Sequence, residues 1–181
     1  MRELSLHILD LVENAIRAGA TVIAVSLEED PARDSLALAV EDDGPGLPVP
    51  AQVATDPFYT TKEGKKTGLG LSLLKFRAEQ AGGSFALDRA GLGGLAVRVT
   101  MPLSGVDRSP LGDLAATLAS VVCTNPDVDL RARLRVADRE LTVSSADVAR
   151  RLPVGARSDI VVAREVRQRI AEGLASLHVT G

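Results

Sequence analysis

Residues 2–18 constrain the fold most, because two separate stripes recur along them at helical spacing. One stripe is apolar and predicts an amphipathic helix packed on a core; it consists of Leu4, Ile8, Leu11, Val12 and Ala15. The other is polar, and its steps of four, three, four and three residues place it on one narrow strip: Glu3, His7, Asp10, Asn14 and Arg17. A carboxylate, an amide and a guanidinium one turn apart suit a metal ion and phosphate groups. The alternative is a solvated stripe with a local Asp10–Arg17 or Glu3–His7 interaction.

The next segments predict a β-hairpin followed by an abrupt polar turn. Residues 21–27 and 35–40 read as strands, and the short polar turn between them favours direct pairing. The sequence Asp42-Asp43-Gly44-Pro45-Gly46 ends the second strand. An ordinary surface turn is one interpretation. Two acids at a strand end, followed by glycines that let the backbone approach a ligand, are a more specific arrangement.

Residues 49–67 show no clear period, and we expect a long mobile loop there. Three of the four lysines fall in this loop, at Lys62, Lys65 and Lys66. Flexible ammonium groups suit a lid that closes over phosphate groups, and chance clustering is the alternative. Gly68 and Gly70 then lead into a predicted helix at residues 71–81. The free amides at the start of such a helix favour an anion.

The rest of the chain is predicted to form a linker and a small α+β region. Strands are expected at residues 84–88 and 95–101, and residues 103–110 resemble a linker. We divide the chain into residues 1–102, this linker and residues 111–181. The last region is predicted to hold helices at 111–122, 145–152 and 158–177 and strands at 129–136 and 140–143. It contains no recognisable chemical constellation.

The composition argues against several classes of function. The net charge of −3 does not suggest a general nucleic-acid binder or a basic membrane-surface protein. One cysteine excludes an internal disulfide, and only two histidines make a transition-metal enzyme a poor hypothesis. No apolar run approaches the roughly 20 residues of a membrane span. We therefore expect a cytoplasmic protein with neither a nucleic acid nor a membrane as its partner.

Taken together, the polar strip, the Asp-Gly turn and the glycine-led helix resemble the histidine-kinase-like ATPase family (GHKL, also HATPase_c). This family includes sensor histidine kinases, gyrase, Hsp90 and MutL. Residues Leu11-Val12-Glu13-Asn14-Ala15 resemble its asparagine box, and Asp42-Asp43-Gly44-Pro45-Gly46 resemble its first glycine box. Two further segments resemble the phenylalanine box and the second glycine box of sensor kinases. These segments are Asp56-Pro57-Phe58-Tyr59-Thr60-Thr61-Lys62 and Thr67-Gly68-Leu69-Gly70-Leu71-Ser72.

The resemblance covers residues 1–102 and implies an α+β fold of the Bergerat type. In this fold a two-layer α/β sandwich has a mixed sheet with helices on one face. The small α+β region at residues 111–181 lies outside the resemblance, and its role stays open.

The resemblance also implies roles in binding ATP and Mg²⁺. Asn14 would ligate Mg²⁺ through its side-chain oxygen, which leaves room for phosphate oxygens. Arg17 would contact a phosphate group, and Asp42 would accept a hydrogen bond from the adenine amino group. Gly44 and Gly46 would let the backbone approach the base. The remaining implied contacts hold or close over the phosphates: Lys62, Lys65, Lys66, Thr67, Gly68, Leu69, Gly70 and Leu71.

The chain departs from the family pattern at two positions near the site. Hydrolysing members carry a glutamate as general base four residues before the asparagine, and here that position is Asp10, one methylene shorter. A threonine often follows the glycine before the last strand, and here Leu95 follows Gly94. Sensor kinases also carry a helical hairpin with the phospho-accepting histidine, which we do not find ahead of the asparagine box.

We therefore predict an ATP- and Mg²⁺-binding signalling protein without its own phospho-accepting domain. It would act as an ATPase or as a kinase toward a partner protein, with Asp10 as the candidate general base. The alternative is a non-catalytic module whose protein interactions are gated by ATP. A third hypothesis is a MutL-like clamp that forms a homodimer on ATP, although the lid matches sensor kinases more closely.

Overall fold

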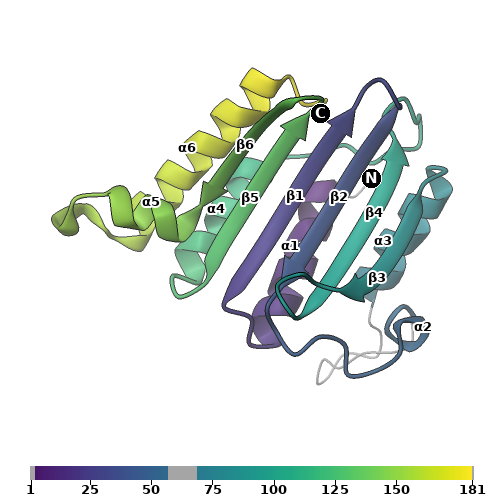
Figure 1. Cartoon of the computed structure of the whole chain (residues 1–181), viewed down its shortest axis with the longest axis horizontal. Helices are drawn as coiled ribbons and strands as arrows, with labels where there is room; N and C mark the ends of the chain where they lie inside the picture. Colours follow the sequence, from purple (N-terminus) through teal and green to yellow (C-terminus); the bar gives the residue numbers. More distant parts are fainter. Residues whose placement is uncertain (1–2, 57–68, 181) are drawn as a thin grey trace.

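The computed structural model describes residues 3–56 and 69–180. Before the predicted linker, a helix followed by two strands occurs twice, with a short helix between the two units, and a second group of helices and strands follows the linker (Figure 1). The strands are β1 (Val22–Asp30), β2 (Ser35–Asp42), β3 (Ser84–Arg89), β4 (Leu95–Pro102), β5 (Asp129–Val136) and β6 (Arg139–Ser144). The helices are α1 (Leu4–Arg17), α2 (Ala51–Ala54), α3 (Leu69–Gln80), α4 (Leu114–Thr124), α5 (Ser145–Arg151) and α6 (Asp159–Leu177), with a 3₁₀ turn, η1, at Val154–Ala156.

The strands form one mixed sheet in the order β3-β4-β2-β1-β5-β6. Neighbouring strands are antiparallel except for β1 and β5, which run parallel. The predicted hairpin of β1 and β2 is confirmed, with Val25 opposite Val40. The predicted α+β architecture with a mixed sheet is confirmed as well.

The helices cover only one face of the sheet, and the reason is the alternation in the strands. Every second residue of β1 and β2 is buried, while the residues between them are partly exposed. In Figure 1, α1, α3, α4 and α6 lie behind the sheet, and the front of the strands is uncovered. The buried strand residues pack with the apolar stripe of α1, as the spacing of Leu4, Ile8 and Val12 predicted.

Residues 111–181 extend this same sheet instead of standing apart from it. The parallel pairing of β5 with β1 begins at Val22 and Asp129 and runs to Glu29 and Val136. One hydrophobic core includes residues from both regions. The end of the chain also returns to β1, where Thr180 donates from its backbone N–H and its hydroxyl to the buried Glu29 carboxylate. The division into two domains stays a prediction, since it rests on sequence alone.

The predicted linker also holds the start of α1. The first helical amides, of Leu4 and Ser5, donate to the carbonyl oxygens of Pro110 and Leu111, each at 2.9 Å. These donors lack partners within their own helix, so Pro110 of the predicted linker and Leu111 directly after it supply the acceptors. The helix that carries the polar strip is thereby fixed to the segment leading into α4.

Two short helical elements lie where none was predicted. α2 interrupts the segment predicted as a long loop, and η1 lies between α5 and α6. Such short elements add few periodic positions, which is why a hydropathy pattern does not reveal them. The rest of the predicted lid, residues 57–67, lies outside the described residues. No helix among the described residues has the length and apolar character that a membrane crossing requires.

Candidate functional site

The residues of the polar strip on helix α1 are buried to different extents. Asp10 and Asn14 are half-buried, Arg17 is exposed, and His7 lies in the interior with 1 % of its surface exposed. The strip is therefore not a uniform solvated face, and His7 belongs to its packed part. Arg17 Nη1 donates to Asn14 Oδ1 at 3.1 Å, and Arg17 Nη2 lies 3.8 Å from Glu13 Oε2. Arg17 thus contacts Asn14 and Glu13, whereas the alternative interpretation of the strip as a solvated stripe paired Arg17 with Asp10.

The start of α3 lies directly against this strip. A methyl group placed on Gly70 would lie 3.9 Å from Asp10 Oδ2 and 4.0 Å from Asn14 Nδ2. Two stretches separated by more than fifty residues thus meet where the sequence predicted a common ligand. The N-terminus of a helix favours negative charge, because its first amides have no partner within the helix.

The carboxylate of Asp42 is buried at the end of β2 and held by the backbone. Only 7 % of its surface is exposed. Its Oδ1 accepts hydrogen bonds from Gly44 N–H at 2.9 Å and from Leu95 N–H at 3.2 Å. Gly94 N–H donates to the Asp42 carbonyl oxygen at 3.0 Å. Because one carboxylate oxygen is fixed by two amides, the orientation of the other is fixed as well.

Gly94 makes this arrangement possible, although the sequence analysis assigned it no role in binding. A methyl group on Gly94 would overlap Asp42 Oδ1 and would lie 2.7 Å from both the Asp42 carbonyl oxygen and Gly44 N. Gly46 has a φ of +78°, a backbone conformation that favours glycine, and it lies close to the Gly94 backbone. The predicted backbone freedom of Gly46 is therefore needed beside Asp42. The sequence signal that could have revealed this role is the position of Gly94 directly before a predicted strand.

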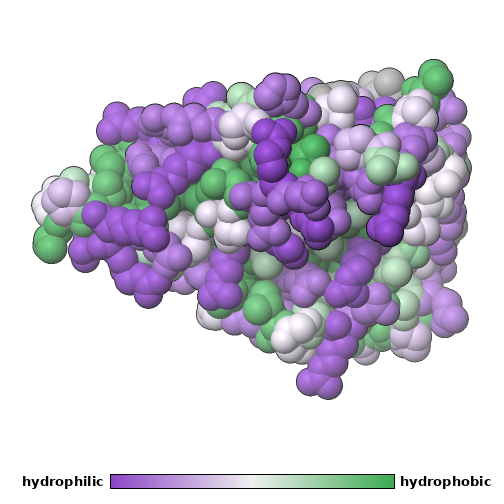
Figure 2. All heavy atoms as spheres, turned by 45° about the horizontal axis from the view of Figure 1, so that its top comes forward, coloured by the Kyte–Doolittle hydropathy of each residue, from purple (hydrophilic) through white to green (hydrophobic). Residues whose placement is uncertain are grey.

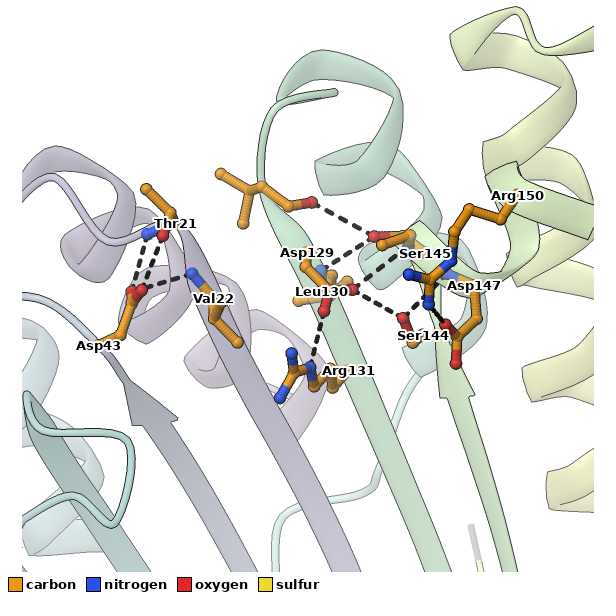
Figure 3. Close-up of polar contacts among 12 residues, drawn as sticks. Thr21, Val22, Asp43, Asp129, Leu130, Arg131, Ser144, Ser145, Asp147 and Arg150 are labelled. Carbon is orange, nitrogen blue, oxygen red and sulfur yellow. Dashed lines mark hydrogen bonds and ion pairs between the residues drawn. The ribbon is translucent and has the colours of Figure 1, made fainter.

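Asp43 fixes the loop that joins α1 to β1 (Figure 3). Its Oδ1 accepts from Thr21 N–H at 2.8 Å and from Val22 N–H at 2.9 Å, and its Oδ2 accepts from the Thr21 hydroxyl at 2.7 Å. These hydrogen bonds, that of Val22 first, lower the pKa of Asp43 below its usual value. Asp43 therefore connects the end of β2 to the loop that follows α1, the helix that carries Asn14. This role was not predicted.

The Asp43 bonds are expected to stabilise the fold at neutral pH and less so in acid. A lowered pKa means that the contribution is fully present above the unfolded value, about 3.8, and is lost as the pH falls through the folded value. We expect Asp43→Ala to lower Tm at pH 7 by about 2–4 °C, the shift that a loss of about 1 kcal/mol produces in a chain of this size. The difference between wild type and variant in urea unfolding should shrink below pH 4. A difference that stays constant to pH 2.5 would contradict this role.

Several predicted contacts cannot be placed in this geometry. Lys62, Lys65, Lys66, Thr67 and Gly68 lie outside the described residues. The backbone of Leu69 begins α3, and Leu71 is half-buried against the core. The structure thus brings together Asp10, Asn14 and Gly70 on one side and Asp42, Gly44, Gly46 and Gly94 on the other.

Asn14 carries a side-chain oxygen of the kind that a magnesium ion takes as a ligand. In the described part of the chain, no three His, Cys, Asp or Glu residues are grouped so as to hold a metal ion. Asn14 Oδ1 is a hard, neutral oxygen that accepts from Arg17 Nη1, while Asn14 Nδ2 is the atom that lies toward Gly70. Such an oxygen suits a single protein ligand of an ion that takes its other ligands from phosphate and water.

The comparisons with known proteins agree with this geometry. A family model described as "Histidine kinase-, DNA gyrase B-, and HSP90-like ATPase" matches residues 2–105. The matched segment contains α1, the Asp42 turn and the start of α3, and ends in the predicted linker.

The similar proteins are larger than the matched segment. Sensor histidine kinase GtrS of Pseudomonas aeruginosa is 33 % identical over 100 residues, which cover 54 % of this chain and 20 % of GtrS. Sensor protein CitS of Halalkalibacterium halodurans is 38 % identical over 72 residues, 38 % of this chain and 13 % of CitS. The crystal structure of the N-terminal domain of a DNA repair protein is similar in fold, with a TM-score of 0.51 and 14 % sequence identity. The match covers 80 % of this chain and 53 % of the chain in that structure. The last comparison bears on the fold alone.

Proposed function

Since this chain belongs to the histidine kinase-, DNA gyrase B- and HSP90-like ATPase family, we propose that it binds ATP with Mg²⁺ and acts in signalling as an ATPase or as a kinase toward a partner protein. The sensor kinases among its relatives are matched over a fifth of their length or less, so their full activities are not carried over to it.

The observation that carries the proposal is the meeting of α1 and α3 at Gly70. Asp10 and Asn14 face the N-terminal end of a helix, and the absence of a side chain on Gly70 leaves room between them. Phosphate groups are favoured at such a helix start, and a carboxylate and an amide beside it supply the groups that phosphoryl chemistry uses.

The other described residues take complementary roles in the proposal. Asn14 would hold the magnesium ion, which neutralises phosphate charge when bound. Arg17 would release Asn14 Oδ1 when that oxygen ligates the metal, and its guanidinium would then be available to a phosphate group. Asp42, with Oδ1 fixed by two amides, would present its other oxygen to the adenine amino group.

Asp10 would orient a water molecule or the acceptor hydroxyl and take its proton. We expect Asp10→Asn to lower turnover by about 100-fold or more, because the amide cannot accept a proton, while ATP affinity changes little. A filter assay of phosphate release, with ATP binding measured on the same preparation, checks this expectation. Unchanged turnover would remove Asp10 from the reaction, and an equal loss of binding would assign it to the binding site only.

The experiment that tests the proposed function follows the γ-phosphate of labelled ATP in the presence of Mg²⁺. Release as free phosphate, or transfer to a protein, is the expected result. Asp42→Asn serves as the control with weakened ATP binding. Label that remains in bound ATP would contradict an enzymatic role of the chain by itself.

That outcome would favour the second candidate, an interaction module gated by ATP. Two observations favour this alternative. Asp10 is shorter than the glutamate of hydrolysing members, and Thr21 links the two regions of the chain: it is held by Asp43 and accepts from Asp129 N–H at 2.9 Å. Nucleotide binding beside Asp42 would then act on β5 and the region that it begins.

A further inference from the structure

The connection between α5 and α6 combines exposed apolar side chains with unpaired positive charge. Val154 is 81 % exposed and Ile160 is 71 % exposed, whereas most large apolar residues of the described chain are buried. In Figure 2 the left end of the molecule, where Figure 1 places this connection, carries hydrophobic atoms between hydrophilic ones. We call residues 150–164 the α5–α6 tip. Val154 and Ile160 are six positions apart in the sequence. Exposed apolar side chains that share one surface mark interaction sites more often than isolated ones do.

The charge of the tip is opposite to that of the whole protein. Residues 150–164 contain four arginines and one acid, while the full chain has a net charge of −3. Arg150 pairs with Asp147, but no ion pair of the described residues engages Arg151 or Arg164. Arg157 uses its guanidinium on two backbone carbonyl oxygens, so its charge also has no carboxylate partner in the described chain.

The tip is held in a defined shape. Arg157 Nε donates to the Leu152 carbonyl oxygen at 2.9 Å and Nη2 to the Arg150 carbonyl oxygen at 3.1 Å, which closes the turn between the two helices. At the other end of α5, Ser144 caps the helix, and Asp129 accepts from the Ser144 hydroxyl at 2.8 Å (Figure 3). A surface that is ordered before binding loses less conformational entropy when a partner binds.

We propose that the α5–α6 tip is a docking surface for an acidic segment of a partner protein that carries a large apolar side chain. The apolar side chain would cover Val154 and Ile160, and carboxylates beside it would pair with Arg151 and Arg164. Charge decides between occupants: two tips that face each other in a symmetric dimer would place arginines against arginines, whereas an acidic segment finds arginines without carboxylate partners in the described chain. The proposal does not depend on the nucleotide role of the other site.

The experiment titrates the ¹⁵N-labelled full chain with a short synthetic peptide that has leucines on one face and glutamates on the other. We expect saturable amide shifts confined to residues 150–164. Val154→Asp should weaken binding by about tenfold or more, because it removes an apolar contact and adds a like charge to the glutamates. Val106→Asp is the matched control, since Val106 is 95 % exposed outside the tip, and it should leave binding unchanged.

Four results would overturn the proposal. The first is the absence of shifts at the tip with the glutamate peptide. The second is equal binding of a peptide with lysine in place of glutamate. The third is an equal loss in Val106→Asp and Val154→Asp, with both variants melting like the wild type. The fourth is self-association in sedimentation that Val154→Asp abolishes, which would assign the tip to a second copy.

Discussion

Replacing Asp42 with asparagine is expected to weaken ATP binding by about 10- to 100-fold, the largest effect on ATP affinity that we expect at the candidate site. Two amides fix Oδ1 of Asp42, so an asparagine keeps its oxygen there and places its NH₂ group where the second carboxylate oxygen was. That NH₂ group is a donor and would face the adenine amino group, also a donor, so a hydrogen bond to a charged acceptor is replaced by a mismatch.

The measurement is a calorimetric titration with ATP and Mg²⁺, accompanied by a melting curve. Asp138→Asn is the matched control, because it removes the same charge at an exposed position. It should leave ATP affinity unchanged. Full affinity in Asp42→Asn would exclude Asp42 as the residue that recognises the base.

The second large effect is expected from Gly94→Ala. The added methyl group would overlap the Asp42 carboxylate and crowd the Asp42 carbonyl oxygen and Gly44 N, so the carboxylate must move. We expect a loss of about 1–3 kcal/mol of stability, as for other overpacked sites, together with a loss of ATP binding of about tenfold or more.

Gly83→Ala separates these two effects. Its methyl group would overlap the Thr100 carbonyl oxygen and lie 2.7 Å from the Thr100 carbonyl carbon, toward the opposite end of β4 from Gly94. It should destabilise the protein to a similar extent and leave the affinity of the folded protein for ATP unchanged. Equal losses of ATP affinity in both variants, at a temperature where both are folded, would mean that Gly94 acts through general stability.

The sequence predicted the elements well because their signals are local. The apolar stripe of α1, the alternation in β1 and β2 and the turn glycines are each carried within one segment. The second stripe of α1 also predicted where Asp10 and Asn14 lie, since a helix fixes the relative positions of its own residues. The position of Asp10 and Asn14 beside Gly70 could be expected only because the separate motifs resemble those of one family.

Other features could not be predicted because they depend on contacts between distant segments. The bonds of Asp43 to Thr21 and Val22, and the space that Gly94 leaves for Asp42, join residues that are 21 to 52 positions apart. The parallel pairing of β5 with β1 likewise has no local signal, because the period of a strand does not identify its neighbour. Residues 111–181 therefore resembled a separate appendage in sequence, whereas in the structure they continue the sheet.

The central claim is that this chain binds ATP through Asp42 and the site between α1 and α3. The most direct test is a titration of the purified wild-type protein with ATP and with GTP, each with Mg²⁺. We predict saturable binding of ATP and binding of GTP that is weaker by about tenfold or more, because guanine has an acceptor oxygen where adenine has its amino group. Equal affinity for the two nucleotides, or no binding of ATP at millimolar concentration, would contradict the account.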